Sequence, residues 1–588
     1  MGRGAASARS SFRGMDSRTA AHALTQIAAF LELRGTNAFK VRAYESAARA
    51  LMKVGADDLA PLLRSGELAT VRGLGPATLS VVRDLIETGE SSYLEQLRAE
   101  MPEGLLEMAR VPGLGAEKIL KLHRELGIAS LDELEAAARD KRLTKVKGFG
   151  PRTAEKILAG IEFMKNAGTV TLYHHAALQA TALLAAVRAH PNVRTAEVCG
   201  SLRRGCEVVS DVDIVAACTR SPESVTQSFA RVPGVRNASG SEGAVTVRFT
   251  DGVKLDLYCV APDEYAVALW RATGGSGHVD AVTRKLAAAG LRLAGDRLVD
   301  AGNRPVSIPD EKALYGAAGL PWIPPELREA RGEVDAADRA ALPALIDALD
   351  VRGVLHCHTR YSDGKSSIAE MTDAARALGW EYLGISDHSQ AAFYASGVSR
   401  EDMLAQHDEI DALNASGVGF RVLKGVEADI LADGRLDYDE ALLDRFDYVI
   451  ASIHSRFRMD GPAMTQRVLH AMDDPHMTIL AHPTGRLLLS REPYALDLDA
   501  VLEKAAAQGV AVEVNADPHR MDLDWRHLQR AKELGVTIAI GPDAHSRAAL
   551  EWTARGVTMA RKGWLGAPDV LNTGSADAVL SFARNRRS

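Results

Sequence analysis

The spacing of hydrophobic residues divides the chain into stretches with different predicted secondary structure. Over residues 16–168, apolar positions recur every three to four residues and β-branched runs are scarce, which predicts helices. Residues 169–320 change to short strands, and residues 321–350, which are rich in proline and then in acids, are expected to form a linker. Over residues 351–575, short apolar strands alternate with helical segments, which is typical of parallel βα units.

A glycine motif recurs three times in the helical stretch. Its copies begin at Val71, Val111 and Val146, and each runs Val-x-Gly-x-Gly into a helical segment. Such a turn exposes backbone N–H groups at the positive end of a helix, which suits a phosphate oxygen. Glycines at plain helix-turn-helix corners are the alternative. The copies resemble helix-hairpin-helix motifs, which implies sequence-independent contact with the DNA backbone by Gly73, Gly75, Gly113, Gly115, Gly148 and Gly150.

Three aspartates in the strand-rich stretch form a candidate cation site. Asp211 and Asp213 are two residues apart, so on a strand they project from the same face. Asp256 lies in the second strand of a hairpin predicted around Asp251-Gly252. Three carboxylates on neighbouring strands can hold two hard divalent cations, and such a pair can promote phosphoryl transfer. Asp-x-Asp alone is common on protein surfaces. Its combination with the upstream Gly-Ser-Leu-Arg-Arg segment favours a functional cation site over an ordinary surface pair.

Residues 20–320 resemble the family X DNA polymerases on these motifs. The resemblance implies an α+β nucleotidyltransferase palm with a thumb, and two Mg²⁺ or Mn²⁺ ions held by Asp211, Asp213 and Asp256. It also implies nucleotide contacts by the residues at three further positions, Ser201, Arg204 and Gly274. Several positions depart from the family pattern, namely Val208, Ser210, Tyr258, Arg271, Ala272 and Val279. The expected metal cage is therefore intact, whereas the pocket for the base and sugar is altered.

Each predicted strand of the last stretch ends in residues of the kind that bind metals. Strand-end ligands collected from many strands are typical of a parallel barrel whose site lies at the carboxyl ends of the strands. Seven such strands predict a barrel one unit short of eight. A lone histidine at a strand end is usually structural, but this set can serve two or three ions. The candidates are His356, His358, Asp363, His388, Glu427, His454, His482, Asp543 and His545.

These strand ends resemble the polymerase-and-histidinol-phosphatase (PHP) domain over residues 351–575. The resemblance rests on segments such as His356-Cys357-His358 and Asp543-Ala544-His545. It implies an α/β distorted (β/α)7 barrel with two to three Mn²⁺ or Zn²⁺ ions and a 3′→5′ exonuclease or 3′-end processing activity. The order of polymerase core, linker and PHP domain is that of bacterial family X polymerases.

Composition and charge agree with a multidomain globular protein of a reducing compartment. The 588 residues carry a net charge of −7, which divides into +1 over residues 1–350 and −8 over the rest. Eleven of the 17 histidines also lie in the acidic part, as a multi-metal site requires. Five cysteines give no disulfide framework, and no apolar run is long enough for a bilayer, so we expect a cytoplasmic protein. Residues 1–15 are expected to be a disordered extension, and 576–588 a tail.

Three functions remain open on the sequence. The first is a DNA repair enzyme, as in base excision repair, that fills gaps and trims 3′ ends. The second is a PHP nuclease whose polymerase core only holds DNA. The third is a small-molecule phosphoesterase of the histidinol-phosphatase type. For the first function the expected partners are gapped or primer–template DNA, irrespective of sequence, and dNTPs. A monomer without membrane association is expected.

Overall fold

The computed structural model describes residues 15–587 except 16, 35–37, 55–57, 89–90, 101–103, 110, 112–113, 115, 152, 159, 162–169, 233, 242, 250–252 and 417–418. The predicted extension over residues 1–15 therefore lies outside the described residues, apart from Met15. The chain divides into two compact units, residues 1–168 and 169–588. Every helix in the described ranges is too short or too polar to cross a membrane.

The first unit is helical, as the three-to-four spacing predicts. Its apolar side chains form two cores, one between Ala20 and Leu97 and the second between Leu105 and Ile161. A further helical segment follows at residues 151–158, with residue 152 not described. The helices are α1 (Ser17–Leu33), α2 (Ala38–Val54), α3 (Ala60–Ser65), α4 (Glu67–Thr70), α5 (Pro76–Thr88), α6 (Ser92–Glu100), α7 (Gly104–Ala109), α8 (Ala116–Leu126) and α9 (Leu131–Arg139).

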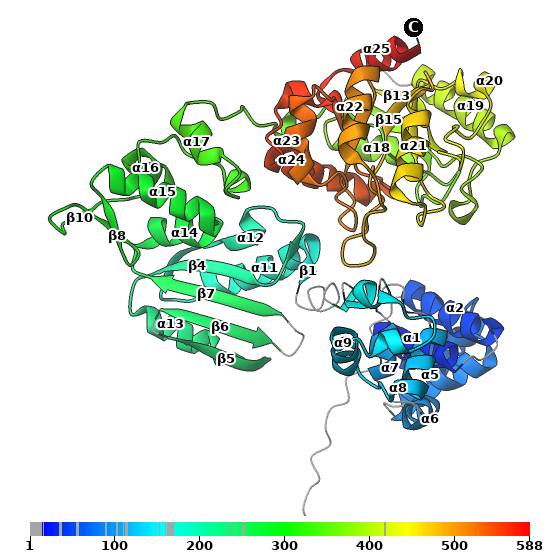
Figure 1. The fold of residues 1–588 in the computed structure, drawn as a ribbon, viewed down its shortest axis with the longest axis horizontal. Coiled ribbons are helices and arrows are strands. Elements are labelled where there is room, and N and C mark those ends of the chain that lie inside the picture. The colour runs from blue at the N-terminus through cyan, green and yellow to red at the C-terminus, as the bar shows by residue number, and fades with distance from the viewer. Residues whose placement is uncertain are drawn as a thin grey trace, which may run out of the picture. The chain divides into compact units, whose positions relative to one another are not determined.

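The second unit begins with a five-stranded mixed sheet of order β2-β4-β7-β6-β5, drawn in green in Figure 1. Helices α11 and α13 share one apolar core with the sheet. The helix that follows the sheet, α14 (Tyr265–Thr273), packs against it in a separate core. Strands β6 and β7 form the predicted antiparallel pair, although its turn, residues 250–252, is not described. The elements are β1 (Thr171–Leu172), α11 (Tyr173–Arg188), β2 (Val193–Val198), α12 (Gly200–Arg203), β3 (Val208–Val209), β4 (Val212–Cys218), α13 (Pro222–Phe229), β5 (Val235–Ser241), β6 (Ala244–Phe249) and β7 (Lys254–Val260).

A small helical subdomain follows the sheet and continues into the stretch expected as a linker. Ile323, Leu327, Val334 and Ala337 are buried in the same core as Trp270, so residues 321–338 belong to this subdomain. One acid of this stretch, Glu333 of α17, is itself buried and pairs with His278. The elements are α14 (Tyr265–Thr273), α15 (Ser276–Ala288), β8 (Arg292–Ala294), β9 (Arg297–Val299), β10 (Pro305–Val306), α16 (Glu311–Ala317) and α17 (Glu333–Asp338).

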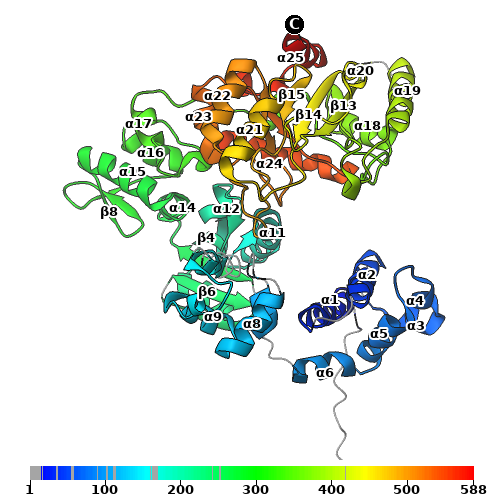
Figure 2. The same cartoon turned by 45° about the vertical axis from the view of Figure 1, so that its right-hand side comes forward.

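Seven parallel strands in sequence order form the last part of the unit, with helices outside them, as Figure 2 shows around β13, β14 and β15. The first and last strands meet through a parallel bridge between Cys357 and Ala544, which nearly closes the barrel. This confirms the predicted distorted seven-stranded barrel. The strands are β11 (Gly353–Val354), β12 (Tyr382–Ile385), β13 (Arg421–Asp429), β14 (Tyr448–Ser452), β15 (Met477–Leu480), β16 (Ala511–Asn515) and β17 (Ile538–Gly541).

The helices of the barrel include one over the stretch expected as a tail. Val579 and Ala583 of α25 are buried in a core that also contains Leu355 and Ile479 of the barrel, so this segment belongs to the barrel. The helices are α18 (Ile368–Ala377), α19 (Arg400–Ser416), α20 (Glu440–Leu443), α21 (Gly461–Ala471), α22 (Leu498–Gln508), α23 (Trp525–Glu533), α24 (Thr553–Lys562) and α25 (Ala576–Arg587).

Candidate metal centres

The carboxyl ends of the barrel strands bring the nine predicted histidines and acids into one cluster. All nine occur in four overlapping groups whose potential ligand atoms lie within 4.8 Å of one another. Parallel strands produce this arrangement because their carboxyl ends all meet at the same end of the barrel. Seven of the nine follow strands, Glu427 lies within β13 near its carboxyl end, and Asp363 is contributed by the loop after β11.

Glu427 lies at the centre of the cluster, at 1% exposure. Its Oε1 is 2.9 Å from His482 Nε2 and 3.3 Å from His454 Nε2. Its Oε2 is 2.9 Å from His388 Nδ1 and 3.4 Å from His356 Nε2. Burial alone would raise the pKa of Glu427, but the surrounding histidines hold it well below its usual range. Glu427 is therefore a carboxylate that faces two potential cation positions, one from each oxygen.

Two further carboxylates, Asp543 and Asp363, complete the cluster. Asp543 Oδ1 is 3.1 Å from His358 Nε2 and 3.5 Å from His356 Nε2. Nearer the surface, Asp363 Oδ1 is 3.3 Å from His545 Nε2. Burial and the neighbouring histidines lower the pKa of His358 to about 4, so its ring is neutral and able to donate a lone pair.

Outside the cluster, carboxylates hold two histidine rings and the backbone next to His358 in place. Glu513 Oε1 accepts from His356 Nδ1 at 2.6 Å, and Asp429 Oδ1 pairs with His454 Nδ1 at 2.8 Å. Asp387 accepts from the backbone N–H of Thr359 at 2.7 Å and from Gln406 at 2.6 Å. Such partners fix the orientation of metal-binding rings. None of these carboxylates is among the site residues predicted from the sequence, although Asp429 shares the face of Glu427 by strand alternation.

The donor set fits divalent cations. His358 Nδ1 is buried and makes no hydrogen bond in the described structure, so a potential ligand atom faces the cluster unused. The donors are imidazole nitrogens and carboxylate oxygens, which suit Mn²⁺ and Zn²⁺. The Cys357 thiol, by contrast, lies in the apolar core of the barrel. Asp543 (φ 50°) and His482 (φ 26°) also have positive φ, which is unfavourable for such residues and is concentrated at functional sites.

The sheet of the polymerase-like part carries a second, smaller acidic cluster. Asp213 of β4 stands in register with Asp256 of the adjacent parallel strand β7, and Asp211 joins them within 4.8 Å. Lys254 Nζ lies 2.7 Å from both Asp211 Oδ2 and Asp256 Oδ2. Burial and the two neighbouring carboxylates raise the pKa of Asp213 to about 7. This excess of negative charge, with an ammonium beside it, fits divalent cations.

The side chain of Asp213 leaves no room for a side chain at Gly200. Gly200 has φ 64°, and a Cβ there would come within 2.0 Å of Asp213 Oδ2. A close approach of the chain to the aspartate therefore requires glycine at this position.

The residues predicted to contact a nucleotide have protein partners. Arg204 donates from Nε to Glu329 at 3.0 Å and from Nη1 to the carbonyl of Thr273 at 2.8 Å. Ser201 is the second residue of the short helix α12, which Arg204 follows, and Gly274 follows α14. The side chains of Arg204 and Glu329 are only 15% and 17% exposed. Arg204 is thus held close to the aspartates by an ion pair.

The positions that depart from the family X pattern are largely engaged elsewhere. Arg271 Nη2 lies 2.6 Å from Asp296 Oδ1, so an acid in the protein neutralises its guanidinium. Ala272 and Val279 pack against apolar cores. Tyr258 is 36% exposed beside the cluster, and burial with Asp213 raises its pKa to about 12. None of these side chains supplies a flat aromatic face at the positions of Arg271 and Ala272.

The described parts of the glycine turns in the helical unit have equivalent local structure. Leu74, Leu114 and Phe149 each donate a backbone hydrogen bond to the valine three residues earlier, at 3.0–3.1 Å. Gly73 (φ 106°) and Gly148 (φ 96°) occupy equivalent left-handed positions. Gly75 and Gly150 face open space at the start of the next helices, whereas Gly113 and Gly115 lie outside the described residues.

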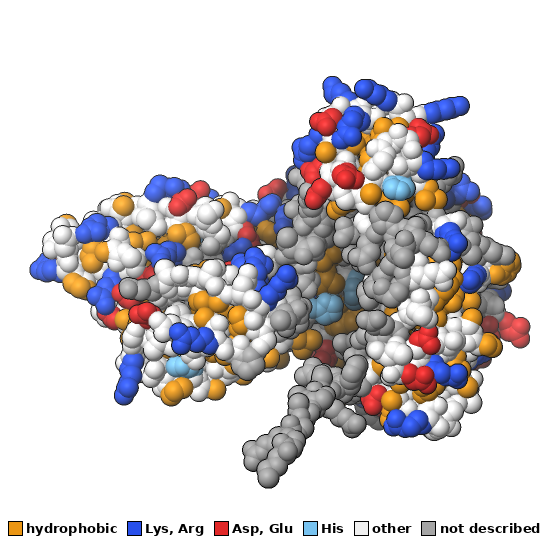
Figure 3. Space-filling model, turned by 90° about the horizontal axis from the view of Figure 1, so that it is seen from below, with side chains coloured by type: hydrophobic (Ala, Val, Ile, Leu, Met, Phe, Trp, Pro, Cys, Tyr) orange, Lys and Arg blue, Asp and Glu red, His pale blue; other side chains and the backbone are white. Residues whose placement is uncertain are grey.

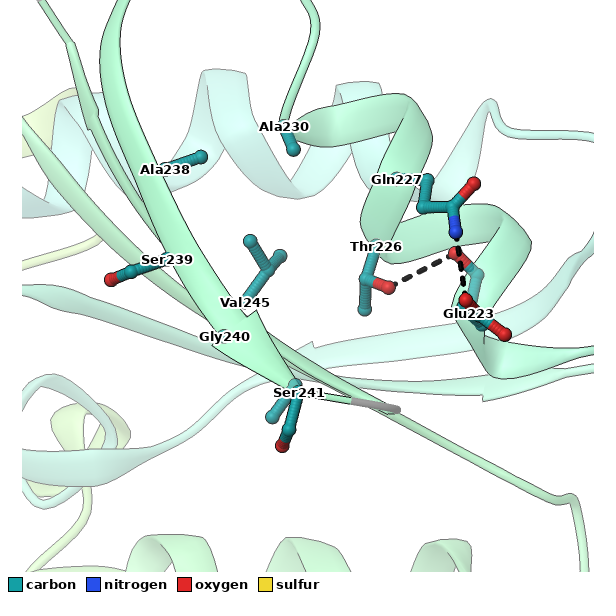
Figure 4. A pocket seen from close by; sticks show the side chains of 10 residues that line it. Glu223, Thr226, Gln227, Ala230, Ala238, Ser239, Gly240, Ser241 and Val245 are labelled. Atoms are coloured by element: carbon teal, nitrogen blue, oxygen red, sulfur yellow. Dashed lines mark hydrogen bonds between the residues drawn. The ribbon is translucent and has the colours of Figure 1, made fainter.

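Two surface features have no cluster of reactive groups. A cleft of about 310 Å³ lies between α13 and the β5–β6 edge, and Figure 4 shows Gln227 bonded to Glu223 at 2.8 Å beside small apolar side chains. On the face drawn in Figure 3, coloured Lys and Arg side chains are spread across the surface rather than gathered in one patch. In the described part of the chain, the groups of side chains that could hold a metal ion therefore lie in the barrel cluster and in the cluster of three aspartates.

Comparison with known proteins agrees with this organisation. Family models match a PHP domain over residues 355–517, a DNA polymerase beta thumb over 268–329, a helix-hairpin-helix domain over 15–91 and a SAM-like helix-hairpin-helix tandem over 105–162. The chain is 37% identical to the DNA polymerase/3′-5′ exonuclease PolX of Bacillus subtilis, over 95% of this chain and 98% of that protein. A probable phosphatase of Clostridium acetobutylicum is 30% identical over 32% of this chain and 78% of its own length. The near full-length match decides between these relatives: the chain belongs to the family X DNA polymerases that carry a C-terminal PHP domain.

Proposed function

We propose that this chain is a DNA repair enzyme with two activities, gap-filling DNA polymerisation in the palm and 3′→5′ exonucleolytic trimming in the PHP barrel. The observation that carries the proposal is the presence of two separate metal-type clusters in one chain, each on the scaffold that its chemistry requires. The similarity to a polymerase/exonuclease over 95% of the chain supports the combination. In a bacterial cell such an enzyme acts in the cytoplasm, where the DNA is.

The barrel cluster would hold two to three Mn²⁺ or Zn²⁺ ions through its nine histidines and acids. Divalent ions at such a site stabilise the charge that develops on a phosphodiester during hydrolysis. The protein's own contribution is orientation and charge: Glu513 and Asp429 fix two rings, and Arg520 Nε lies 3.4 Å from Asp543 Oδ2. The partly exposed Arg520 guanidinium can therefore help to attract a phosphate to the edge of the cluster.

The palm cluster would hold two Mg²⁺ or Mn²⁺ ions through Asp211, Asp213 and Asp256. In nucleotidyl transfer the aspartates carry the negative charge that positions both cations, and Lys254 must move from its present place between two of them. Ser201, Arg204 and Gly274 would bind the triphosphate of the incoming dNTP.

The helical unit would bind DNA through backbone N–H groups at its glycine turns, without reading sequence. The local equivalence of the described turns supports this role. Gapped or primer–template DNA is the substrate expected, and the enzyme would act as a monomer.

A second candidate function is favoured by the pocket beside the palm aspartates. Because Arg271 is paired with Asp296 and Ala272 is packed inward, the aromatic contacts expected for a base and sugar are missing at these positions. A polymerase core that only holds DNA for the PHP nuclease is consistent with this. A histidinol-phosphatase-type phosphoesterase is disfavoured, because the phosphatase relative covers only 32% of the chain.

One primer–template assay distinguishes these functions. The purified protein is incubated with a 5′-labelled primer on a gapped template, with and without dNTPs, in Mg²⁺ and in Mn²⁺. The proposal expects extension with dNTPs and shortening without them. Shortening under both conditions would favour the DNA-holding core, and an intact primer under both would contradict the nuclease assignment.

A further inference from the structure

A buried lysine of the PHP barrel contacts the nucleotide side of the polymerase core. Lys562, at the end of α24, is 1% exposed. Its Nζ lies 2.7 Å from Glu329 Oε1 and donates to the backbone carbonyl of Arg204 at 3.0 Å. The same ammonium lies 4.3 Å above the centre of the Trp525 ring. An amine buried this completely requires such partners, because an unpaired buried charge is unfavourable.

Glu329 is shared between this lysine and Arg204. One oxygen, Oε1, accepts from Lys562 and from Arg204 Nε, the latter at 3.0 Å. Burial would raise the pKa of Glu329, but Lys562 and Arg204 hold it below its usual range. The carboxylate is therefore ionised and compensated by two cations, one from each domain.

The surrounding interface fixes the lysine relative to the palm. Glu207, next to the palm strand β3, is 4% exposed and accepts from Trp525 Nε1 at 3.1 Å and from Arg526 at 2.8 Å. Arg561, beside Lys562, pairs with Glu326 at 2.8 Å. These buried and partly buried polar contacts have specific geometry, so the barrel presents Lys562 to Glu329 at a defined position.

We propose that Lys562 is a positioning residue for the polymerase activity: it compensates Glu329, so that Arg204 can exchange this carboxylate for the triphosphate of an incoming nucleotide. The proposal rests on the proposed function, in which Arg204 binds the triphosphate. When Arg204 leaves, Glu329 would be left as a partly buried carboxylate without a cation, and Lys562 prevents this. The PHP barrel thus contributes to nucleotide binding through Lys562 without touching the nucleotide.

The test replaces the lysine and then removes the charge that it compensates. Single-nucleotide insertion into a one-nucleotide gap is measured in a His358→Ala background, so that trimming does not interfere. Lys562→Met should raise the KM for dNTP about tenfold and leave kcat within about twofold, because ground-state exchange is impaired. Lys562→Met with Glu329→Gln should return the KM close to the parent value, because no carboxylate remains to be compensated. Lys532→Met is the matched control, since Lys532 bonds within the barrel to Asp569 at 2.8 Å.

The outcomes separate this inference from the proposed function. An unchanged KM in Lys562→Met, or a raised KM that Glu329→Gln does not restore, would overturn the inference. If Lys562→Met does not fold, Glu329→Gln alone decides: the inference expects a KM equal to or below that of the parent, and a raised KM would overturn it. If the parent inserts no nucleotide, its polymerase assignment fails, and binding of a fluorescent dATP analogue tests the inference directly. Equal binding by parent and Lys562→Met, or none by either, would then reject it.

Discussion

Glu513 should control the metal affinity of the PHP cluster although it is not placed as a ligand. Its Oε1 accepts from His356 Nδ1 at 2.6 Å, and its Oε2 accepts from the His482 backbone N–H at 2.8 Å. Glu513→Gln keeps the shape but has one acceptor oxygen in place of two. One donor must then face an NH₂ group, which leaves a buried donor unsatisfied and shifts a ring or the strand end.

Loss of such an outer partner lowers metal affinity about 10- to 100-fold, or about 1.4–2.7 kcal/mol. Because both donors belong to residues of the cluster, His356 and His482, the loss of either contact displaces a ligand residue, and we expect a value near the upper end. The measurement is calorimetric titration of the metal-free protein with Mn²⁺, together with the Mn²⁺ dependence of primer trimming. Trimming by Glu513→Gln should recover at saturating Mn²⁺, since the ligands remain. Glu503→Gln on α22, with the side chain 61% exposed, is the control. An unchanged Mn²⁺ midpoint in Glu513→Gln would refute the reasoning.

Three further outcomes are expected. Gly200→Ala should lower nucleotide insertion at least about 100-fold and leave trimming unchanged, because the new Cβ would lie 2.0 Å from Asp213 Oδ2. Normal insertion by this variant would contradict the close approach of residue 200 to Asp213. DNA affinity, measured by fluorescence anisotropy, should fall about 10³-fold or more as salt rises from 50 to 200 mM if six or more phosphates are contacted, and it should vary little with DNA sequence. Gly148→Ala should weaken DNA binding, and equal affinity of this variant would count against a role for the turn. Burial holds the pKa of His407 at about 4, below its value in the unfolded chain, so its contribution to stability is full above about pH 6.5 and is lost as the pH falls toward 4. In urea unfolding, His407→Leu should lose less stability than the parent over this pH range, and parallel curves of stability against pH would argue against a contribution of His407.

The members of the barrel cluster can be predicted from the sequence because the topology of parallel strands brings their carboxyl ends together. Any residue that follows a parallel strand is brought to the same end of the barrel, so His388 and His482 both reach Glu427 without any signal in the chain between them. The palm carboxylates follow from strand alternation at Asp211 and Asp213 and from the pairing of β4 with β7. Local periodicity and the direction of strands are sufficient for these residues.

The supporting residues could not be predicted in the same way. Glu513 and Glu503 are both glutamates of the barrel, and only the fold turns one inward and leaves the other on the surface. The pairing of Arg204 with Glu329 joins residues 125 positions apart, and Lys562 comes from another domain. Likewise, the helix over residues 576–587 is recognisable as part of the barrel only from the core that it covers. These features depend on tertiary packing and leave no local pattern.

Separation of the two activities by single substitutions tests the central claim most directly. Parent, His358→Ala and Asp256→Ala proteins are each incubated with a 5′-labelled primer in a gapped duplex and Mn²⁺, with and without dNTPs. Two independent sites predict that His358→Ala extends the primer and does not shorten it, whereas Asp256→Ala shortens the primer and does not extend it. Trimming that survives His358→Ala with metal still bound, or extension that survives Asp256→Ala, would contradict the account.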